Sequence, residues 1–339
     1  MIDLRSDTVT RPTAAMRAAM AAAEVGDDVL DGDPTTQRLE AQTAAVLGCE
    51  AALFFPSGTM ANQAAIWCWT TPGTEVYVDA ESHIVHWELA GAAALAGVQI
   101  RPITGLGQRP FRAAALAAGL RDNPFHPRAT LVAVENTHNG SGGTVYDVAE
   151  LEAIAAIARD LRLPVHVDGA RLWNAAVALG VTPAELVAAA DSVMVSFSKG
   201  LGAPVGACLA GSAAFIARAR EARKRFGGGM RQSGVLAAAA LVGLDGFEAR
   251  LARDHAHAAQ LARAVADIAG LGVVAPETNI VMLDLPDGVV SADVVAAAKR
   301  EGVLLSGWSR QRVRAVLHGD VAASDVALAA AVLRRVLTR

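Results

Sequence analysis

Lys199 and Asp168 are the residues whose types and positions could do chemistry together. Lys199 follows the alternating apolar run of residues 192–197 and precedes Gly200, so it stands where a strand enters a glycine turn. Asp168 follows an earlier apolar run, residues 163–167, and small residues come next. Singly, each is more often an ordinary strand-end acid or a surface lysine. As a pair they suit pyridoxal phosphate, because the amine forms a Schiff base and the carboxylate pairs with the protonated ring nitrogen.

A strand-to-helix turn at Ser57, Gly58 and Thr59 could hold the phosphate of that cofactor. It follows the apolar run of residues 51–55 and supplies backbone N–H groups, two hydroxyls and the positive end of a helix. The alternative is a plain connecting turn, and the turn by itself leaves both interpretations open. It is not a nucleotide-binding P-loop, because no Gly-Lys-Ser/Thr follows.

Three further side chains could complete such a site. His83 comes just after the apolar run of residues 75–79, where an imidazole could stack on a flat ring or transfer a proton. Arg171 and Arg314 offer planar guanidinium groups, which suit a substrate carboxylate. A lone histidine is more often structural and a lone arginine more often forms a surface ion pair. His83 gains weight because its strand belongs to the same predicted parallel sheet as the strand that ends at Asp168. Arg171 follows Asp168 by three residues and can reach the same pocket, whereas Arg314 belongs to the predicted small domain.

The elements that must position these residues alternate between apolar strands and amphipathic helices. A helix is expected from Asp33 and Pro34, an N-cap and a first-turn proline, to Gly48, and another begins at a capping box at Thr182. Strands separated by helices predict an α/β fold with a mostly parallel sheet, in which ligands bind at the carboxyl ends of the strands. The strands are expected at residues 51–55, 75–79, 98–103, 130–135, 163–168, 192–197 and 204–210.

The alternation changes after about residue 245. A long helix over residues 248–269 is expected, then strands near 272–275, 279–285 and 313–317, and a last helix over 323–337. We therefore predict a large domain of residues 1–245 and a small α+β C-terminal domain of residues 246–339. Residues 1–30 show little periodicity, and we assign them to the large domain as a segment that lies across another part of the structure.

Composition excludes several classes of protein. A net charge of −4, a pI of about 6.1 and the absence of a Lys/Arg-rich run argue against a nucleic-acid partner. Prolines and amides interrupt the longest uncharged stretch, residues 51–74, so no membrane span is expected. The acidic residues 27–33 lack the ligand pattern of a calcium loop, and no metal is expected. Three widely spaced cysteines (Cys49, Cys68 and Cys208) and no readable signal peptide predict free thiols and a cytoplasmic location.

Several stretches, in order along nearly the whole chain, match a known family. The chain resembles the L-threonine aldolases, which belong to the fold type I pyridoxal-phosphate enzymes. The run Ser-Phe-Ser-Lys-Gly-Leu-Gly-Ala-Pro-Val-Gly is highly specific. The matching stretches are residues 3–10, 24–28, 56–60, 135–139, 166–171, 196–206 and 227–232.

The resemblance implies cleavage of L-threonine or L-allo-threonine to glycine and an aldehyde by a retro-aldol reaction. It implies a fold type I large domain and a homotetramer, a dimer of dimers with active sites at subunit interfaces. The implied catalytic residues are Lys199, His83 and His126, the last two near the β-hydroxyl. The implied cofactor-binding residues are Lys199, Asp168, His83, Ser57, Gly58, Thr59, Arg171, Ser196 and, from a neighbouring subunit, Arg231. The implied substrate-binding residues are Ser6, Arg171, Arg314 and His126.

Two departures from the family pattern and several alternatives bear on this interpretation. Family members often have tyrosine where this chain has Leu30, which affects the expected pocket edge, and threonine where it has Leu317.

The closest alternative is a β-eliminating lyase or another fold type I enzyme, since all share the aspartate and the lysine. A non-catalytic pyridoxal-phosphate fold fits less well, because Lys199 and both arginines are present. A nicotinamide-dependent enzyme would need a glycine fingerprint that the chain lacks.

Overall fold

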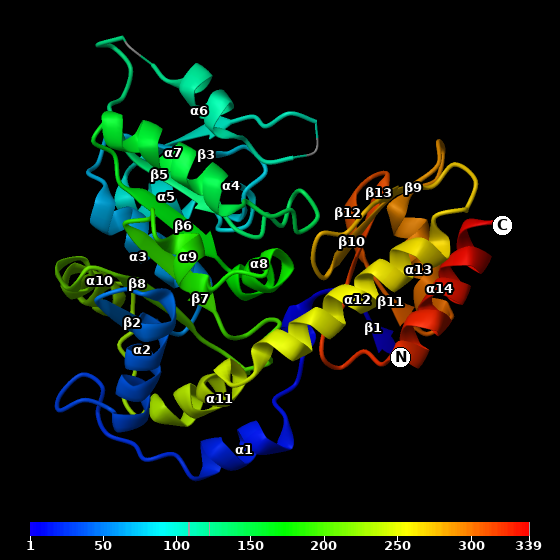
Figure 1. Cartoon of the computed structure of the whole chain (residues 1–339), viewed down its shortest axis with the longest axis horizontal. Helices are drawn as coiled ribbons and strands as arrows, with labels where there is room; N and C mark the ends of the chain where they lie inside the picture. The colour runs from blue at the N-terminus through cyan, green and yellow to red at the C-terminus, as the bar shows by residue number, and fades with distance from the viewer. Residues whose placement is uncertain (108, 122, 339) are drawn as a thin grey trace.

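The computed structural model describes residues 1–107, 109–121 and 123–338, and it shows a large α/β part joined to a smaller C-terminal part (Figure 1). The sheet of the large part has the strand order β2-β8-β7-β6-β5-β3-β4. All neighbouring pairs are parallel except those that β8 makes with β2 and β7. Its strands are β2 (Ala51–Phe55), β3 (Glu75–Asp79), β4 (Gln99–Ile103), β5 (Ala129–Glu135), β6 (Val165–Gly169), β7 (Ser192–Ser196) and β8 (Ala207–Gly211).

The mostly parallel sheet predicted from the sequence is confirmed, and two strands begin two or three residues later than expected. The strand predicted from residue 204 begins at Ala207, because Gly206 adopts a φ of 112°, which turns the chain. The strand predicted from residue 163 begins at Val165, because Pro164 has no N–H for a ladder and offers only its carbonyl, to Val132.

Helices cover both faces of this sheet, and the alternation of side chains along each strand explains how. In β7, Val193 and Val195 belong to the core beneath α2, α7 and α8, whereas Met194 packs with α3 and α10 on the other face. The helices of the large part are α1 (Ala14–Ala21), α2 (Pro34–Leu47), α3 (Gly58–Trp69), α4 (His83–His86), α5 (Gly91–Ala96), α6 (Ala113–Gly119), α7 (Val148–Asp160), α8 (Leu172–Leu179), α9 (Pro183–Val187), α10 (Ala213–Arg225) and α11 (Gly234–Leu244).

The predicted helix boundaries are confirmed where capping chemistry marked them. Asp33 caps α2 by accepting a hydrogen bond from the Thr36 amide at 2.8 Å, and Gly48 ends the helix with a φ of 65°. At α9, Thr182 and Glu185 form the reciprocal capping box. These ends are specified by short-range interactions, and so the sequence alone can locate them.

The C-terminal part contains an antiparallel sheet of order β12-β13-β10-β9 with helices against it. The long helix α12 (Phe247–Val265) packs on α8 of the large part as well as on α14 and β10, so it joins the two parts (Figure 1). The remaining elements are β9 (Gly272–Val274), β10 (Ile280–Asp284), α13 (Ser291–Arg300), β11 (Val303–Leu304), β12 (Ser306–Ser309), β13 (Arg312–Val316) and α14 (Ala323–Leu337). The division after residue 245 stays a prediction.

The N-terminal segment contacts both parts of the molecule. Strand β1 (Ile2–Asp3) pairs in parallel with β11, and Leu4 lies in the hydrophobic core of the C-terminal part. Further along, α1 packs on α11. The first residues therefore lie against the small part, and the assignment of residues 1–30 to the large domain stays a prediction. Two-residue strands have too short a pattern to be recognised in a sequence.

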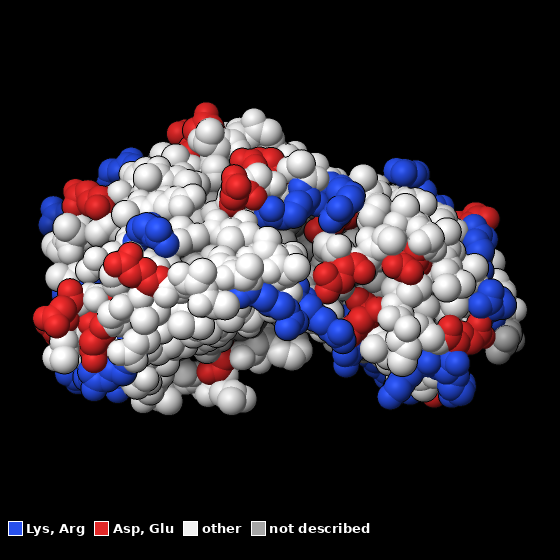
Figure 2. Space-filling view, turned by 90° about the horizontal axis from the view of Figure 1, so that it is seen from below, with Lys and Arg blue, Asp and Glu red and all other residues white. Residues whose placement is uncertain are grey.

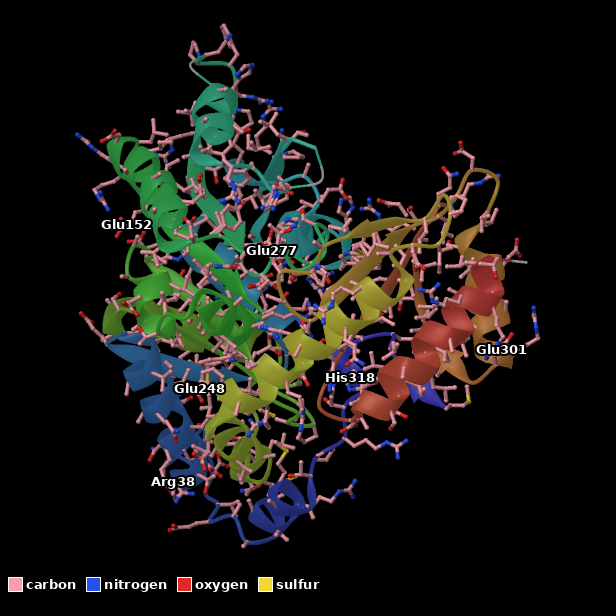
Figure 3. All side chains as sticks on the ribbon, turned by 45° about the vertical axis from the view of Figure 1, so that its right-hand side comes forward. Arg38, Glu152, Glu248, Glu277, Glu301 and His318 are labelled. Carbon is pink, nitrogen blue, oxygen red and sulfur yellow. The ribbon has the colours of Figure 1, made fainter. Side chains whose placement is uncertain are left out.

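A loop of the C-terminal part reaches back to the large part. Glu277, between β9 and β10, accepts hydrogen bonds from the Val145 amide at 2.9 Å and from Arg109 at 2.8 Å. Figure 3 shows Glu277 on the side of the small part that faces the large one, and His318 beside α14 and the N-terminal segment. His318 shares a hydrogen bond of 2.7 Å with the carbonyl oxygen of Asp3.

The surface carries charged side chains of both signs. Lysine and arginine are mixed with aspartate and glutamate on the face that Figure 2 shows, and neither sign dominates it. Among the residues that the structure describes, no helix combines the length and the apolar character that a membrane span requires.

Asp254, on α12, carries a pH-dependent contribution to stability. Both of its carboxylate oxygens are buried without a hydrogen-bond partner in the described part of the chain, and burial raises its pKa to about 7. An unfolded aspartate titrates near 4 (~3.9). Between these values the folded chain keeps a proton that the unfolded chain releases, so folding becomes less favourable as the pH rises from about 4 to about 7.

We therefore expect Asp254→Asn to raise the free energy of unfolding at pH 8 by on the order of 2 kcal/mol, because the neutral amide needs no proton to be buried. The gain should be smaller at pH 5, where the wild-type carboxyl is already protonated. Thermal denaturation at both pH values tests this, with the exposed Asp160→Asn as control. An equal gain at both pH values would contradict the assignment.

Candidate active site

The carboxyl ends of the parallel strands gather the candidate residues at one edge of the sheet. A cavity of about 300 Å³ opens there between the large and the C-terminal parts. Of the residues predicted from the sequence, Ser6, His83, Arg171, Lys199 and Arg314 line it together. Its other lining residues are Thr8, Trp87, Asn139 and Trp308.

Lys199 stands in a tight turn after β7. Its carbonyl oxygen accepts hydrogen bonds from the Gly202 amide at 2.8 Å and from the Thr10 hydroxyl at 3.4 Å. Gly202 has a φ of 79°, a conformation that glycine adopts without strain. Burial, with the nearby Arg171 charge, lowers the pKa of the Lys199 amine. A larger fraction of the amine is therefore unprotonated and able to attack a carbonyl carbon.

Asp168 is the penultimate residue of β6, the strand next to β7, and is 1% exposed. One carboxylate oxygen accepts a hydrogen bond from the Asn62 amide at 2.8 Å, and the other accepts from the backbone N–H of Ala170 at 3.1 Å. Ligand atoms of Asp168, His83 and Glu88 lie within 4.8 Å of one another. Asp168 is therefore beside the histidine that lines the cavity.

Two buried glutamates hold His83. Its backbone N–H donates to Glu135 at 2.6 Å, and its ring Nδ1 shares a hydrogen bond of 2.9 Å with Glu88. Burial opposes a positive charge on this ring, but the hydrogen bond to Glu88 and the neighbouring carboxylates outweigh burial and raise the pKa of His83. With Nδ1 engaged, Nε2 is the ring nitrogen that remains for a ligand.

Arg171 is held by a buried bidentate ion pair. Its Nε and Nη2 donate to the two carboxylate oxygens of Asp7 at 2.8 and 2.7 Å, and Nη1 lies 3.5 Å from the Asn139 oxygen. Burial alone would raise the pKa of the Asp7 carboxyl, but the charge and hydrogen bonds of Arg171 hold it well below its usual range. Asp7 is thus ionised at neutral pH.

Arg314 reaches the same cavity from β13 of the C-terminal part. Its Nη1 donates to the Asn139 side-chain oxygen at 2.7 Å, and its Nη2 donates to the Arg5 carbonyl at 3.1 Å. The guanidinium lies 4.8 Å from the centre of the Trp308 ring, and Trp308 packs against Trp87 at 5.5 Å. Burial, together with repulsion from Arg171, lowers the pKa of Arg314 to about 10. Asn139 therefore joins the two arginines.

The turn predicted to bind phosphate has the expected form. Ser57 caps α3 by accepting a hydrogen bond from the Met60 amide at 3.2 Å. The backbone N–H groups of Gly58 and Thr59 have no hydrogen-bond acceptor among the described residues, and Thr59 is exposed. Ser196 ends β7, where its hydroxyl lies 3.4 Å from that of Ser198. Two unpaired N–H groups at a helix N-terminus suit an anion.

Two groups of the residues singled out in the sequence do not line this cavity in the single chain. The first comprises Asp168, Ser196 and the turn at residues 57–59. The second comprises three exposed side chains. His126 is exposed and lines a separate hollow with Tyr77 and Arg128. Arg231 lies 3.2 Å from Asp27 in an exposed ion pair, and Leu30 is 74% exposed. Their roles in catalysis, phosphate binding and substrate preference stay predictions, and they require a second subunit to bring these side chains to the cavity.

Sequence reasoning missed the residues that orient the cavity's charged groups. Asp7 and Asn139 lie within stretches that carry the family resemblance, so that signal could have identified them. Glu88, Asn62 and Trp308 lie outside those stretches, and the sequence carries no signal for them. Their significance comes from contacts made only in the folded chain.

Comparison with known proteins places this geometry in a family. Residues 3–287 match the model of a family described as beta-eliminating lyase. The chain is 44% identical over 333 residues to low-specificity L-threonine aldolase 1 of Arabidopsis thaliana, which covers 96% of this chain and 93% of that protein. It is 40% identical to the low specificity L-threonine aldolase of Escherichia coli K12, and the match covers 100% of both chains.

The chain belongs to the beta-eliminating lyase family. A solved structure of the Leishmania major threonine aldolase superposes on this chain with a TM-score of 0.84 at 20% identity. The superposition covers 99% of this chain and 100% of the Leishmania chain. That likeness concerns the fold. The resemblance to the L-threonine aldolases and the fold type I architecture, both predicted from the sequence, are confirmed.

The ion pair between Arg171 and Asp7 leads to a prediction for substrate binding. We expect Asp7→Asn to raise the KM for the amino-acid substrate by about tenfold or more, because the Arg171 fork loses the carboxylate that orients it. Steady-state kinetics measure this. The matched control is Asp3→Asn, which removes an exposed pair with Arg5 in the same segment. Equal KM values for the two variants would show that Asp7 does not orient Arg171.

Proposed function

We propose that this chain is a pyridoxal-phosphate-dependent aldolase that cleaves L-threonine and L-allo-threonine to glycine and acetaldehyde. The observation that carries the proposal is that Lys199 and Asp168, from adjacent strands, lie beside a cavity lined by Arg171 and Arg314. Lys199 and Asp168 suit the cofactor, and the two arginines suit the substrate carboxylate. The identity of 40–44% to low-specificity L-threonine aldolases over nearly the whole chain supports this reaction.

The residues of this chain fit the cofactor at each of its functional groups. Lys199 would hold its aldehyde carbon and Asp168 its ring nitrogen, and His83 would stack on the ring. Ser57, Gly58, Thr59 and Ser196 would hold its phosphate, with Arg231 of a second subunit. When bound, pyridoxal phosphate supplies an electron sink for the electrons of a broken bond at the substrate's α-carbon.

The two arginines orient the substrate. Arg171 Nη1 and Arg314 flank Asn139, and Ser6 accepts two hydrogen bonds from Thr8, which leaves its own O–H free to donate. A carboxylate held by these donors fixes rotation about the bond between the nitrogen and the α-carbon. That rotation would decide which bond at the α-carbon breaks, and in the proposed reaction it would be the bond to the β-carbon.

His83 is the residue of this chain best placed to accept the β-hydroxyl proton. Its Nδ1 is bonded to Glu88, so the neutral ring offers Nε2 as the acceptor. Loss of that proton releases the aldehyde. The structure places His126 outside this cavity, so a direct role for it requires an adjacent subunit. The histidine must be neutral to act as base.

Assembly and location belong to the same proposal. Arg231 and His126 are exposed in the single chain, and a homotetramer built from dimers would bring such side chains to a neighbouring site. A cytoplasmic location is consistent with Cys49, Cys68 and Cys208, which are free thiols in the structure. Sedimentation velocity of the purified chain measures the assembly directly.

Removal of the Schiff-base lysine is the direct test of the activity. We expect Lys199→Ala to lose the visible absorbance of the lysine-bound cofactor and at least about a thousandfold in acetaldehyde release from L-threonine. The surface variant Lys299→Ala is the matched control. Near-normal turnover in Lys199→Ala would refute the assignment.

The family model favours a second candidate, β-elimination. Incubation of the wild-type enzyme with a β-substituted amino acid distinguishes the two activities. Pyruvate and ammonia would indicate elimination, whereas glycine and an aldehyde from L-threonine indicate the aldolase reaction.

The contact between His83 and Glu88 predicts the pH dependence. Because Glu88 helps to raise the pKa of His83, activity should increase with pH as the ring loses its proton, at a pH above that of an ordinary histidine. We expect Glu88→Gln to move this acid limb of kcat/KM to lower pH. A limb that does not move would remove His83 as the titrating base.

A further inference from the structure

A chain of buried hydrogen bonds runs from Trp69 to the carboxylate of Asp168. The Trp69 ring N–H donates to the Ser192 hydroxyl at 2.8 Å, and that hydroxyl lies 2.9 Å from Nδ1 of His166. His166 Nε2 lies 3.1 Å from the side-chain oxygen of Asn62, whose amide nitrogen donates to Asp168 at 2.8 Å. His166, Asn62, Ser192 and Asp168 are each at most 1% exposed, so water does not compete for these bonds.

The chemistry of each group determines which partner donates in every hydrogen bond of this network. An indole N–H only donates, so Ser192 accepts from it and turns its own proton toward His166 Nδ1. The Asn62 amide nitrogen faces two carboxylates, Asp168 and Glu88 at 3.1 Å, and only an N–H₂ group can satisfy both. The Asn62 oxygen must then accept, so His166 carries its proton on Nε2.

His166 takes part as a neutral ring. Burial lowers its pKa to about 4. A protonated imidazole would place a positive charge within the network and partly neutralise Asp168. The neutral ring leaves the negative charge of Asp168 available to a cation at the cofactor's ring nitrogen. His166 and Asp168 lie two residues apart on β6, so both side chains point to the face that α3 covers.

The second N–H of the Asn62 amide is bonded to Glu88, and Glu88 is in turn bonded to His83, which lines the cavity. The same Glu88 oxygen that accepts from Asn62 also accepts from His83 Nδ1 at 2.9 Å, and the other oxygen accepts from Gln63 at 2.5 Å. One amide thus contacts both the carboxylate for the ring nitrogen and the glutamate that sets the His83 tautomer. The His83, Glu88 and Asp168 cluster is in this way satisfied by N–H donors.

We propose that Asn62 is a positioning residue that aims Asp168 at the cofactor's ring nitrogen and, through Glu88, keeps Nε2 of His83 directed to the substrate. Asn62 is itself oriented by His166, Ser192 and Trp69. The inference rests on the proposed function, since it needs pyridoxal phosphate at this site. It extends the site to residues that line no part of the cavity.

The test compares binding of two cofactors to the cofactor-free enzyme. Pyridoxal phosphate has a ring nitrogen, and its 1-deaza analogue has carbon at that position. Because Asn62 acts through Asp168, Asn62→Leu should weaken pyridoxal phosphate binding by about tenfold and leave binding of the analogue within about twofold. The two dissociation constants come from titrations followed by absorbance, without any turnover.

Three further variants keep the result interpretable. Ser192→Ala, which removes the donor to His166, should shift the same ratio of dissociation constants in the same direction by a smaller factor. His166→Phe should behave similarly. The control is Asn174→Ala, which removes another buried asparagine bonded to a histidine, His255, at 3.1 Å. The control should leave the ratio unchanged.

The possible results distinguish failure of the Asn62 positioning role from failure of the proposed function. An unchanged ratio in Asn62→Leu and Ser192→Ala would overturn the positioning role, even if turnover fell. Equal weakening of both cofactors would mean that Asn62 supports the fold and not the ring-nitrogen contact, which also overturns it. If the wild-type enzyme binds no pyridoxal phosphate, the proposed function fails first.

Discussion

The buried ion pair between Arg171 and Asp7 is the interaction on which the site depends. It attaches the N-terminal segment to the end of β6, and that same segment pairs with β11 and contributes Leu4 to the core of the C-terminal part. Both partners lie out of water, and breaking such a pair would leave an unpaired buried charge, which typically costs about 3–5 kcal/mol. The segment is thereby held where the two parts of the molecule meet.

This pair also sets how each arginine can bind a substrate. Two nitrogens of Arg171 are committed to Asp7, so only Nη1 remains for a ligand. Arg314 is less committed, because its Nε is buried without a partner among the described residues. Asn139 accepts from both guanidinium groups and keeps them from separating despite their like charges. The proposed carboxylate site is therefore preorganised, with unequal contributions from its two arginines.

The sequence predicted those features that short-range patterns specify. Lys199 and Asp168 were found because strand ends in a parallel sheet share an edge, and α2 was found because Asp33 and Gly48 carry capping chemistry. The contacts of Asp7 and Asn62 join residues more than one hundred positions apart, and no local pattern records them. The family resemblance has a limit of its own. It implies roles for His126 and Arg231, but neither side chain reaches the site within one chain.

Under the proposed function, the selection of the bond that breaks depends on the C-terminal part more than on Lys199 and Asp168. Lysine and aspartate at adjacent strand ends serve lyases of several kinds, so they do not specify cleavage to the β-carbon. In the proposed reaction, Arg171 from the large part and Arg314 from β13 fix the rotation of the substrate, and Trp308 lies between Arg314 and Trp87. Any shift of the small part would move Arg314 and Trp308 together while Lys199 and Asp168 stayed in place. Under the proposed function, the placement of the C-terminal part thus determines which reaction the lysine and aspartate pair performs.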